Sequence, residues 1–288
     1  MARQKLTIVV TCTDRKFFLP APDLTARTLP LASVNERAAE WRRRLNNSVR
    51  ATPLSQLYKG ESWAQARRLI QCANGHGYDT DFLVASAGLG LRRVDDLAAS
   101  YSATFTFGQA DSVATSAADA SRWWDLLPHQ VSAVQGPSLW VLSSAYAKAM
   151  RNTLSTLDPS DSLVFGGSAG IAEPSRVASD RALRSELGGT ATSLNLRMAI
   201  QWLELAADRS PWAPETRSAW RSWAGRVRMV ERYDRTPTTD EAVRTFLVEL
   251  RKHDPSVSKT RALRTLRSSG VACEQRRFSN LFEEVVNS

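Results

Sequence analysis

Four short, uninterrupted apolar runs, separated by helical patterns, constrain the fold of this chain most strongly. The runs are Leu6–Val10, Phe82–Ala85, Leu139–Leu142 and Leu163–Phe165. A strand that is apolar along its whole length, without alternation, is typical of a parallel sheet covered on both faces. Strands that alternate with helices predict an α/β domain with a parallel four-stranded sheet flanked by helices.

Helical patterns fill the intervals between these runs and continue after the last one. The expected helices are Val34–Leu45, Trp63–Cys72, Ala117–Leu127 and Ala145–Leu157. After Ile171 the strand signals stop, and Ser193–Ala207 and a Trp-rich stretch read as further helices. We therefore predict an α/β domain with a helical extension over residues 1–232, and we read Tyr233–Thr239 as a linker.

Residues 233–288 have the pattern of three short helices. Thr238 and Glu241 have capping-box spacing, which predicts a helix start at about Thr239, and Pro255 ends that helix. The second helix, Ser258–Ser268, stops before Gly270. The expected third helix runs from about Cys273 to Val286. Their apolar positions are Val243, Phe246, Leu247 and Leu250, then Ala262, Leu263 and Leu266, then Phe278, Leu281, Phe282 and Val285.

The second and third of these helices are rich in basic residues. Between Lys259 and Arg277 there is one acidic residue, Glu274, and there are six basic ones. The basic residues are Lys259, Arg261, Arg264, Arg267, Arg276 and Arg277. Three short helices with a tight turn and a basic face are typical of a helix-turn-helix-like unit that binds DNA phosphates. The alternative is a small helical dimerisation or capping bundle with a solvated basic face.

The whole chain is also basic, with a formal net charge of +9. An excess of this size indicates a polyanionic partner, and nucleic acid is the usual one. Arginines outnumber lysines by 32 to six among the 38 cations. Codon bias in a GC-rich genome explains that preference, but it does not explain the net charge.

Cysteine and histidine residues are few and scattered. The cysteines are Cys12, Cys72 and Cys273, and the histidines are His76, His129 and His253. Their number and spacing predict no disulfide framework, no paired-cysteine zinc site and no histidine-based metal site, so we expect no cofactor or metal. The first strand begins too early for a signal peptide, and no stretch is long enough to span a membrane. These features predict a cytoplasmic protein without a membrane partner.

Ligands of doubly wound sheets bind at the carboxyl ends of the strands, so the residues that follow each strand are the candidate site. The first strand leads into Cys12–Lys16, where Asp14 stands beside two cations, Arg15 and Lys16. The alternative is a solvated loop pair. Cys12 has no histidine nearby in sequence and reads as a small core residue. The glycine-rich turns Ser86–Leu91 and Gly166–Gly170 match neither a Walker A loop nor a dinucleotide-binding fingerprint, which disfavours nucleotide hydrolysis.

Three stretches taken together carry a resemblance to a known family. They are Cys12–Lys16, Leu57–Gly60 before a Trp-bearing helix, and Ser86–Leu91 leading to Tyr101–Phe105. The chain from Lys5 to Gly170 thereby resembles the small base-handling domains related in fold to uracil-DNA glycosylases. One such domain occurs in archaeosine synthases, and similar domains occur in bacterial genome-defence loci. Some glycosylases of that setting remove hypermodified cytosines from phage DNA.

The resemblance implies an enzyme that flips a base out of double-stranded DNA and breaks its N-glycosidic bond. It implies Asp14 and Tyr101 as catalytic residues, with the Asp14 carboxylate stabilising an oxocarbenium-like sugar and orienting water. Asp95 and Asp96 are the reserve acids. The expected substrate-binding residues are Thr13, Lys16, Tyr58, Lys59, Ser86, Gly88, Leu89, Gly167 and Ser168. Backbone amides of Gly88–Gly90 or of Gly166–Gly170 are expected to receive the phosphates.

Further roles follow from the same resemblance. Arg92 and Arg93 are expected to hold the DNA strand or to fill the gap that the flipped base leaves. Tyr58, Trp63, Tyr101 and Phe105 are candidates for stacking on the flipped base, and core packing is the alternative for Trp63 and Phe105. A lyase variant requires Lys16 or Lys59 as nucleophile, and the alternative role of both is phosphate contact.

Two departures from uracil-DNA glycosylases limit the expected substrate. The loop after the first strand keeps only the acid, Asp14, of the family's Gly-Gln-Asp-Pro motif. The loop Gly166–Gly170 has no histidine where that family carries His-Pro-Ser. The sequence therefore predicts a DNA glycosylase for a modified base, such as glucosylated hydroxymethylcytosine, and not for uracil. The alternatives are a DNA-binding regulator with a nucleoside-sensing α/β domain, and a tRNA-base modification enzyme.

Overall fold

The computed structural model describes residues 3–129, 134–171, 175–229 and 236–287. The chain divides into two compact units, Met1–Met229 and Val230–Ser288, and each is described by itself. The boundary expected between residues 232 and 233, and the first part of the expected linker, lie outside the described residues.

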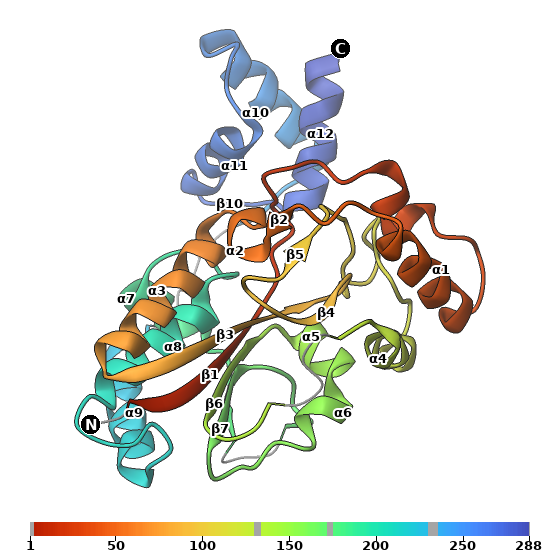
Figure 1. Cartoon of the computed structure of the whole chain (residues 1–288). Helices are drawn as coiled ribbons and strands as arrows, with labels where there is room; N and C mark the ends of the chain where they lie inside the picture. Colours follow the sequence, from red (N-terminus) through yellow and green to blue (C-terminus); the bar gives the residue numbers. More distant parts are fainter. Residues whose placement is uncertain (1–2, 130–133, 172–174, 230–235, 288) are drawn as a thin grey trace. The chain divides into compact units, whose positions relative to one another are not determined.

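A six-stranded sheet forms the centre of the first unit, in the order β4-β3-β1-β6-β7-β8 (Figure 1). Its four inner strands are the four expected ones, all parallel: β1 (Gln4–Thr11), β3 (Tyr78–Ser86), β6 (Ser138–Leu142) and β7 (Ser162–Gly166). The expectation of four strands is too low because two short edge strands flank them. β4 (Gly90–Arg93) pairs antiparallel with β3 through a tight turn, and β8 (Arg176–Val177) pairs parallel with β7.

Helices cover both faces of this sheet, which explains why its strands are apolar throughout. On one side α3 (Glu61–Gly75) packs against α8 (Leu194–Leu205), with α9 (Pro214–Val227) beside α8 (Figure 1). On the other side α4 (Ala117–Leu126) packs between α1 (Val34–Asn46) and α5 (Ser144–Ala149). The core between these layers includes six fully buried tryptophans, Trp41, Trp63, Trp123, Trp124, Trp140 and Trp202.

The expected helix Ala145–Leu157 is in fact two, because the backbone at Met150 leaves the helical conformation between α5 and α6 (Arg151–Leu154). The remaining elements are short connections: η1 (Pro22–Leu24), η2 (Ala26–Thr28), β2 (Thr52–Pro53), α2 (Leu54–Leu57), β5 (Leu97–Ala98), η3 (Arg181–Leu183) and α7 (Arg184–Leu187). Among the described residues, no helix combines the length and the apolar character needed to cross a membrane.

The second unit contains the three expected helices, α10 (Asp240–His253), α11 (Lys259–Ser268) and α12 (Gln275–Asn287). The expected apolar positions form its core, with Val243, Leu247 and Phe278 fully buried. The unit is not purely helical, because β9 (Thr236–Pro237) and β10 (Val271–Ala272) form a short parallel pair.

Helix ends in this unit follow local backbone chemistry. The expected capping box of Thr238 and Glu241 does not form, because the N-cap is the next residue, Thr239. Its side chain accepts a hydrogen bond from the Ala242 amide. At the end of α11, Gly270 takes a φ of +79°, a left-handed conformation that glycine adopts without strain.

Candidate functional site at the carboxyl ends of β1 and β3

The loop after β1 is paired with the segment around Tyr58. Thr13 Oγ1 donates to the Lys59 carbonyl at 3.3 Å, and the Lys59 amide donates to the Arg15 carbonyl at 3.0 Å. The Phe17 amide donates to the Leu57 carbonyl at 3.0 Å. Two of the three motifs that carry the family resemblance therefore lie side by side. Their first residues, Cys12 and Leu57, are 45 residues apart in the sequence.

The third motif joins them through a group of side chains that we call the hydroxyl cluster, in which Cys12 is half-buried and the other members are buried. Its members are Cys12, Tyr58, Ser86, Tyr101 and Tyr146. The Tyr101 hydroxyl lies 2.7 Å from that of Tyr58 and 2.6 Å from Ser86 Oγ. The Tyr146 hydroxyl lies 3.0 Å from Cys12 Sγ and accepts a hydrogen bond from the Ala87 amide at 3.2 Å. Burial raises the pKa of all three tyrosines well above the usual value, so the phenols stay protonated.

Two tryptophan indoles hold the turn between β3 and β4. Trp41 Nε1 donates to the Gly88 carbonyl at 2.7 Å, and Trp123 Nε1 donates to the Ala87 carbonyl at 2.8 Å. A Cβ at Gly88 would stand 2.5 Å from the Tyr101 ring, so only glycine fits there. The Gly88 and Leu89 amides both donate to Ser86 Oγ, which occupies the donors that were expected to receive phosphate.

Lys16 lies between the hydroxyl cluster and the protein surface. Its Nζ lies 4.3 Å from the centre of the Tyr101 ring and donates to the carbonyls of Thr13 and Asp14 at 3.3 and 3.4 Å. Burial lowers the pKa of Lys16, and the acidic groups of Cys12, Asp14 and Asp111 oppose that shift. The ammonium group is therefore held in place by a ring face and two carbonyls.

The expected stacking residues are not exposed. Tyr58, Tyr101 and Phe105 are each 1 % exposed and Trp63 is 2 % exposed, so all four are core side chains in this structure. The expected site residues that remain at the surface are Asp14 and Lys59, which are exposed, and Thr13 and Lys16, which are half-buried. The chemistry available to a ligand at this edge is thus one carboxylate flanked by two cations and a hydroxyl.

The glycine-rich loop after β7 lies two strands away from Asp14, because β6 separates β1 from β7. Gly166 and Gly167 both have left-handed backbones, with φ of +83° and +66°. The Gly167 amide donates to the Leu142 carbonyl at 3.0 Å, so it is not a phosphate donor here, while Ser168 is half-buried. Gly166 and Gly167 therefore allow the ends of β6 and β7 to pack closely together.

The two arginines expected to hold DNA differ from each other. Arg92 is 5 % exposed and its Nε donates to the Leu89 carbonyl at 2.9 Å, which supports the turn and argues against a contact with a DNA strand. Arg93 is exposed and forms an ion pair with Asp81. The reserve acid Asp96 accepts a hydrogen bond from the Arg93 amide at 3.0 Å, and Asp95 is exposed.

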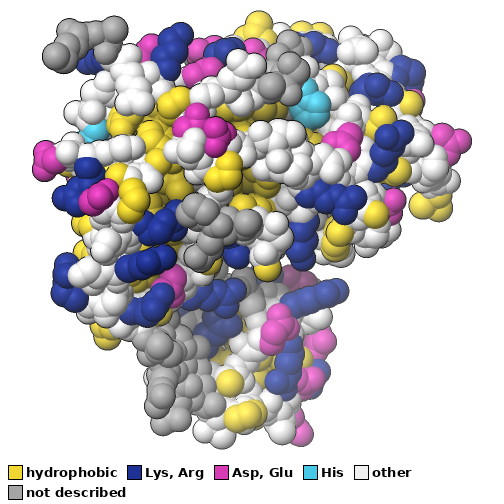
Figure 2. Space-filling view, turned by 90° about the horizontal axis from the view of Figure 1, so that it is seen from below, with side chains coloured by type: hydrophobic (Ala, Val, Ile, Leu, Met, Phe, Trp, Pro, Cys, Tyr) yellow, Lys and Arg dark blue, Asp and Glu magenta, His cyan; other side chains and the backbone are white. Residues whose placement is uncertain are grey.

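Most of the basic side chains of the second unit have partners. Lys259 pairs with Glu283 at 2.7 Å, Arg261 with Asp254 at 3.1 Å and Arg277 with Asp240 at 2.5 Å. Arg267 donates to the Cys273 carbonyl at 3.1 Å. Arg264 and Arg276 are exposed, and their guanidinium groups form no hydrogen bond or ion pair among the described residues, although the charge of Arg276 helps to lower the pKa of Glu274. In Figure 2 the visible Lys and Arg side chains are interspersed with Asp and Glu.

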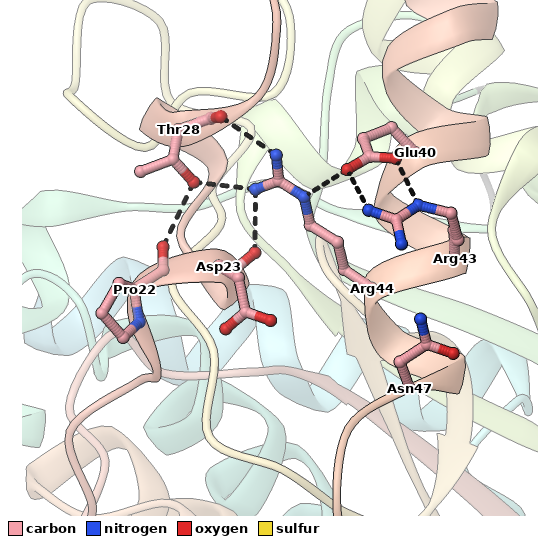
Figure 3. A pocket seen from close by; sticks show the side chains of 7 residues that line it. All are labelled: Pro22, Asp23, Thr28, Glu40, Arg43, Arg44 and Asn47. Atoms are coloured by element: carbon pink, nitrogen blue, oxygen red, sulfur yellow. Dashed lines mark hydrogen bonds and ion pairs between the residues drawn. The ribbon is translucent and has the colours of Figure 1, made fainter.

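A surface hollow of about 370 Å³ lies beside α1, and Figure 3 shows its lining. The Arg44 guanidinium donates to Glu40 at 2.7 Å, to Thr28 Oγ1 at 2.8 Å and to the Asp23 carbonyl at 2.9 Å. Arg43 donates to the same Glu40 at 2.7 Å. Since the hollow's cations already have partners, this cluster stabilises the junction of α1 with η1 and η2 and is not a candidate active site.

Sequence reasoning gave no role to three groups that the structure reveals, the first two beside this region and the third at the opposite end of α3. Tyr146 follows β6, so the strand-end rule that selected Asp14 also finds it. Asp111 lies in an irregular segment with no sequence signal. Cys72 and His76 lie four residues apart on α3 and meet Glu204 of α8, the one group of potential metal ligands found among the described residues.

Asp111 makes a testable contribution to stability. Its carboxylate accepts hydrogen bonds from Ser102 Oγ at 2.8 Å and from the Arg27 amide at 3.0 Å, and it forms an ion pair with Arg27. Chiefly because of Arg27, the pKa of Asp111 falls to about 2. A folded-state pKa below the unfolded value of about 3.9 stabilises the protein above pH 4, and this gain disappears as the pH falls toward 2.

We expect Asp111→Asn to lower the free energy of unfolding by about 1–2 kcal/mol at pH 7, a value reduced for the solvent exposure of Arg27. The difference from the parent protein should shrink steadily between pH 4 and pH 2. Urea unfolding at a series of pH values measures it. A difference that stays constant down to pH 2 would show that the charge of Asp111 is not what stabilises the fold.

Comparisons of the chain with known protein families, with curated proteins and with solved structures found no match.

Proposed function

We propose that this protein is a DNA glycosylase that excises a modified base, built on a fold of the uracil-DNA-glycosylase type. The observation that carries the proposal is the meeting of three separated motifs at one sheet edge. Hydrogen bonds join the loop of Asp14 to Lys59, and the hydroxyl cluster joins Tyr58 to Tyr101 and Ser86. These are the same three motifs that carry the resemblance to the uracil-DNA-glycosylase-like domains.

The reaction assigned to this edge needs few groups. Water attacks C1′ of the sugar, the C1′–N bond breaks with its electron pair going to the base, and the base gains a proton. The exposed Asp14 carboxylate is suited to stabilise the positive charge on the sugar and to take the proton of the water. Lys16 and Lys59 are suited to bind the phosphates on either side.

Tyr101 acts indirectly in this proposal. Its ring supports the Lys16 ammonium at 4.3 Å and its hydroxyl orders Ser86, which in turn fixes the turn after β3. Tyr101 is therefore assigned as a positioning residue, and Asp14 as the catalytic acid-base group.

The test is a panel of duplex DNAs that carry cytosine, uracil, methylcytosine, hydroxymethylcytosine or glucosylated hydroxymethylcytosine. After incubation with the purified protein and treatment with alkali, strand breaks report abasic sites. We expect breaks in a modified-cytosine DNA and none in the uracil DNA. Absence of breaks in every DNA, together with tight binding, would overturn the glycosylase proposal.

One observation favours a second candidate, a non-enzymatic DNA-binding regulator. Tyr58 and Tyr101 are 1 % exposed, so neither ring presents a free face on which a flipped base can stack. In this reading the α/β unit binds a nucleoside-like ligand at the Asp14 edge without cleaving it. A panel that also contains transfer RNA separates this candidate from a tRNA-base modification enzyme, because only the enzyme releases or changes a base.

DNA binding by the second unit has its own test. The exposed guanidinium groups of Arg264 and Arg276 form no hydrogen bond or ion pair among the described residues, so they can reach phosphates, with Arg276 also close to the Glu274 carboxylate. We expect the double variant Arg264→Ala/Arg276→Ala to bind duplex DNA more weakly and to reduce the slope of log K against log salt by about 1–2. The matched control is Lys259→Ala/Arg261→Ala, whose cations are paired with acids and should matter less. Equal losses of DNA affinity in both double variants would show that ion pairing within the unit does not decide which cations contact phosphate.

A further inference from the structure

Helices α3 and α8 are tied together at both ends by polar side chains. Near the start of α3, Glu61 Oε1 accepts hydrogen bonds from Ser193 Oγ at 2.7 Å and from Arg197 Nη2 at 3.1 Å. Near its end, Glu204 of α8 meets Cys72 and His76. The Glu61–Arg197 contact is an ordinary hydrogen-bonded ion pair. Cys72, His76 and Glu204, in contrast, each offer a ligand atom to a metal.

The distances in the second tie match a metal site. Cys72 Sγ lies 3.4 Å from Glu204 Oε1, and His76 Nε2 lies 3.6 Å from Glu204 Oε2. All three ligand atoms lie within 4.8 Å of one another. Metal–ligand bonds of 2.0–2.3 Å in a tetrahedral arrangement place neighbouring ligand atoms roughly 3.3–3.7 Å apart. Each of the two contacts falls in this range, but Cys72 faces Oε1 of Glu204 and His76 faces Oε2, so an ion would have to draw both ligands around the same carboxylate.

The backbone favours this convergence. Cys72 and His76 are four residues apart, which places them on the same side of α3, and His76 is the residue that ends the helix. The carboxyl end of a helix carries a partial negative charge that attracts cations. Glu204 comes from the last turn of α8, the neighbouring helix. Cys72 and His76 are half-buried and Glu204 is exposed, so an ion can enter from solvent.

We propose that Cys72, His76 and Glu204 form a binding site for Zn²⁺. A thiolate, an imidazole and a carboxylate are the mixed sulfur, nitrogen and oxygen set that zinc accepts, whereas Mg²⁺ and Ca²⁺ require oxygen ligands throughout. The thiolate and the carboxylate together balance the charge of the ion. Three protein ligands leave one coordination position to water.

The site is distinct from the Asp14 edge. It lies where α3 ends and leads into the amino end of β3, whereas Asp14 and the hydroxyl cluster lie at the carboxyl ends of the strands. The 15 residues of α3 span about 22 Å. The zinc ion therefore joins α8 of the helical extension to α3 and takes no part in base excision. The proposal stands whether or not the glycosylase proposal does.

The test uses the full chain without a polyhistidine tag, stripped of metal with a chelator. Titration with Co²⁺ should give the visible absorption of a tetrahedral ion and a near-ultraviolet thiolate-to-cobalt band that saturate at one equivalent, and Zn²⁺ should remove both. Cys72→Ser should abolish the thiolate band. Glu204→Gln, a change at an exposed position, should weaken binding at least roughly tenfold, since loss of a partner behind a ligand already costs that much.

His253→Asn is the matched control, because His253 is exposed and lies in the second unit. It should bind Co²⁺ as the parent protein does. Zn²⁺ at 100 times its Kd should raise Tm of the parent and of this control by roughly 5–10 °C, and Mg²⁺ should not. Absence of a thiolate band in the parent protein, or an unchanged affinity in folded Glu204→Gln, would overturn the proposal.

Discussion

Replacement of Gly166 by alanine is expected to destabilise the first unit by about 3–5 kcal/mol, one of the two largest effects predicted for a single substitution. The backbone of Gly166 has a φ of +83°, a left-handed conformation that costs other residues strain. A Cβ there would stand 2.4 Å from the Leu142 carbonyl oxygen and 2.1 Å from Asn195 Nδ2. The carbonyl belongs to β6 and cannot move away, so strain and overpacking add.

Gly170→Ala is the control for this prediction. Gly170 lies in the same glycine-rich loop, it has no positive φ, and nothing lies within 4 Å of the position of its Cβ. We expect its free energy of unfolding to change by less than about 0.5 kcal/mol. Urea unfolding followed by tryptophan fluorescence measures both variants. Equal stability of the two would show that the loop relaxes around the added methyl group.

Asp14→Asn is expected to reduce base excision by roughly 100- to 10,000-fold, the range seen when a positioned acid-base or charge-stabilising group is removed. The amide keeps the shape of the side chain but neither carries the negative charge nor accepts a proton from water. Since Asp14 is exposed and none of the described residues donates a hydrogen bond to its carboxylate, the fold should not change. Single-turnover excision with the best DNA of the panel gives the rate.

Asp95→Asn controls for the loss of one negative charge near the same domain edge, because Asp95 is also exposed. It should excise at the parent rate. DNA affinity should be unchanged or slightly higher in both variants, since each loses a charge that repels phosphate. A parent-like rate in Asp14→Asn together with a loss of rate in Asp95→Asn would instead assign the chemistry to that reserve acid, and parent-like rates in both would exclude both acids.

The strands and helices of this protein were largely predictable because their signals are local. Continuous apolar runs and helical periodicity depend on burial of nearby residues, and Leu6–Val10 or Val34–Leu45 show them without any tertiary information. The two added edge strands were missed for the same reason. β8 has two residues, and β4 is defined by its pairing with β3 and not by a pattern of its own.

The candidate site was predictable in position but not in its contacts. The strand-end rule placed Asp14 and Ser86 at one edge, yet it gave no sign that Tyr58 and Tyr101 face each other in the core. Aromatic side chains suit both a stacking surface and a packed interior, and sequence alone does not separate these uses. Arg92 was assigned to DNA from the family resemblance, whereas here it is buried and the Leu89 carbonyl satisfies its Nε.

The hydroxyl cluster has a consequence for how this protein can change in evolution. The Tyr58 hydroxyl has the Tyr101 hydroxyl as its partner, so Tyr101→Phe leaves a buried polar atom unsatisfied at a cost of about 1–3 kcal/mol. Replacing both tyrosines with phenylalanine removes that penalty for Tyr58, whereas Ser86 is still needed because its Oγ accepts the Gly88 and Leu89 amides. Homologous chains should therefore exchange Tyr58 and Tyr101 together while they keep Ser86.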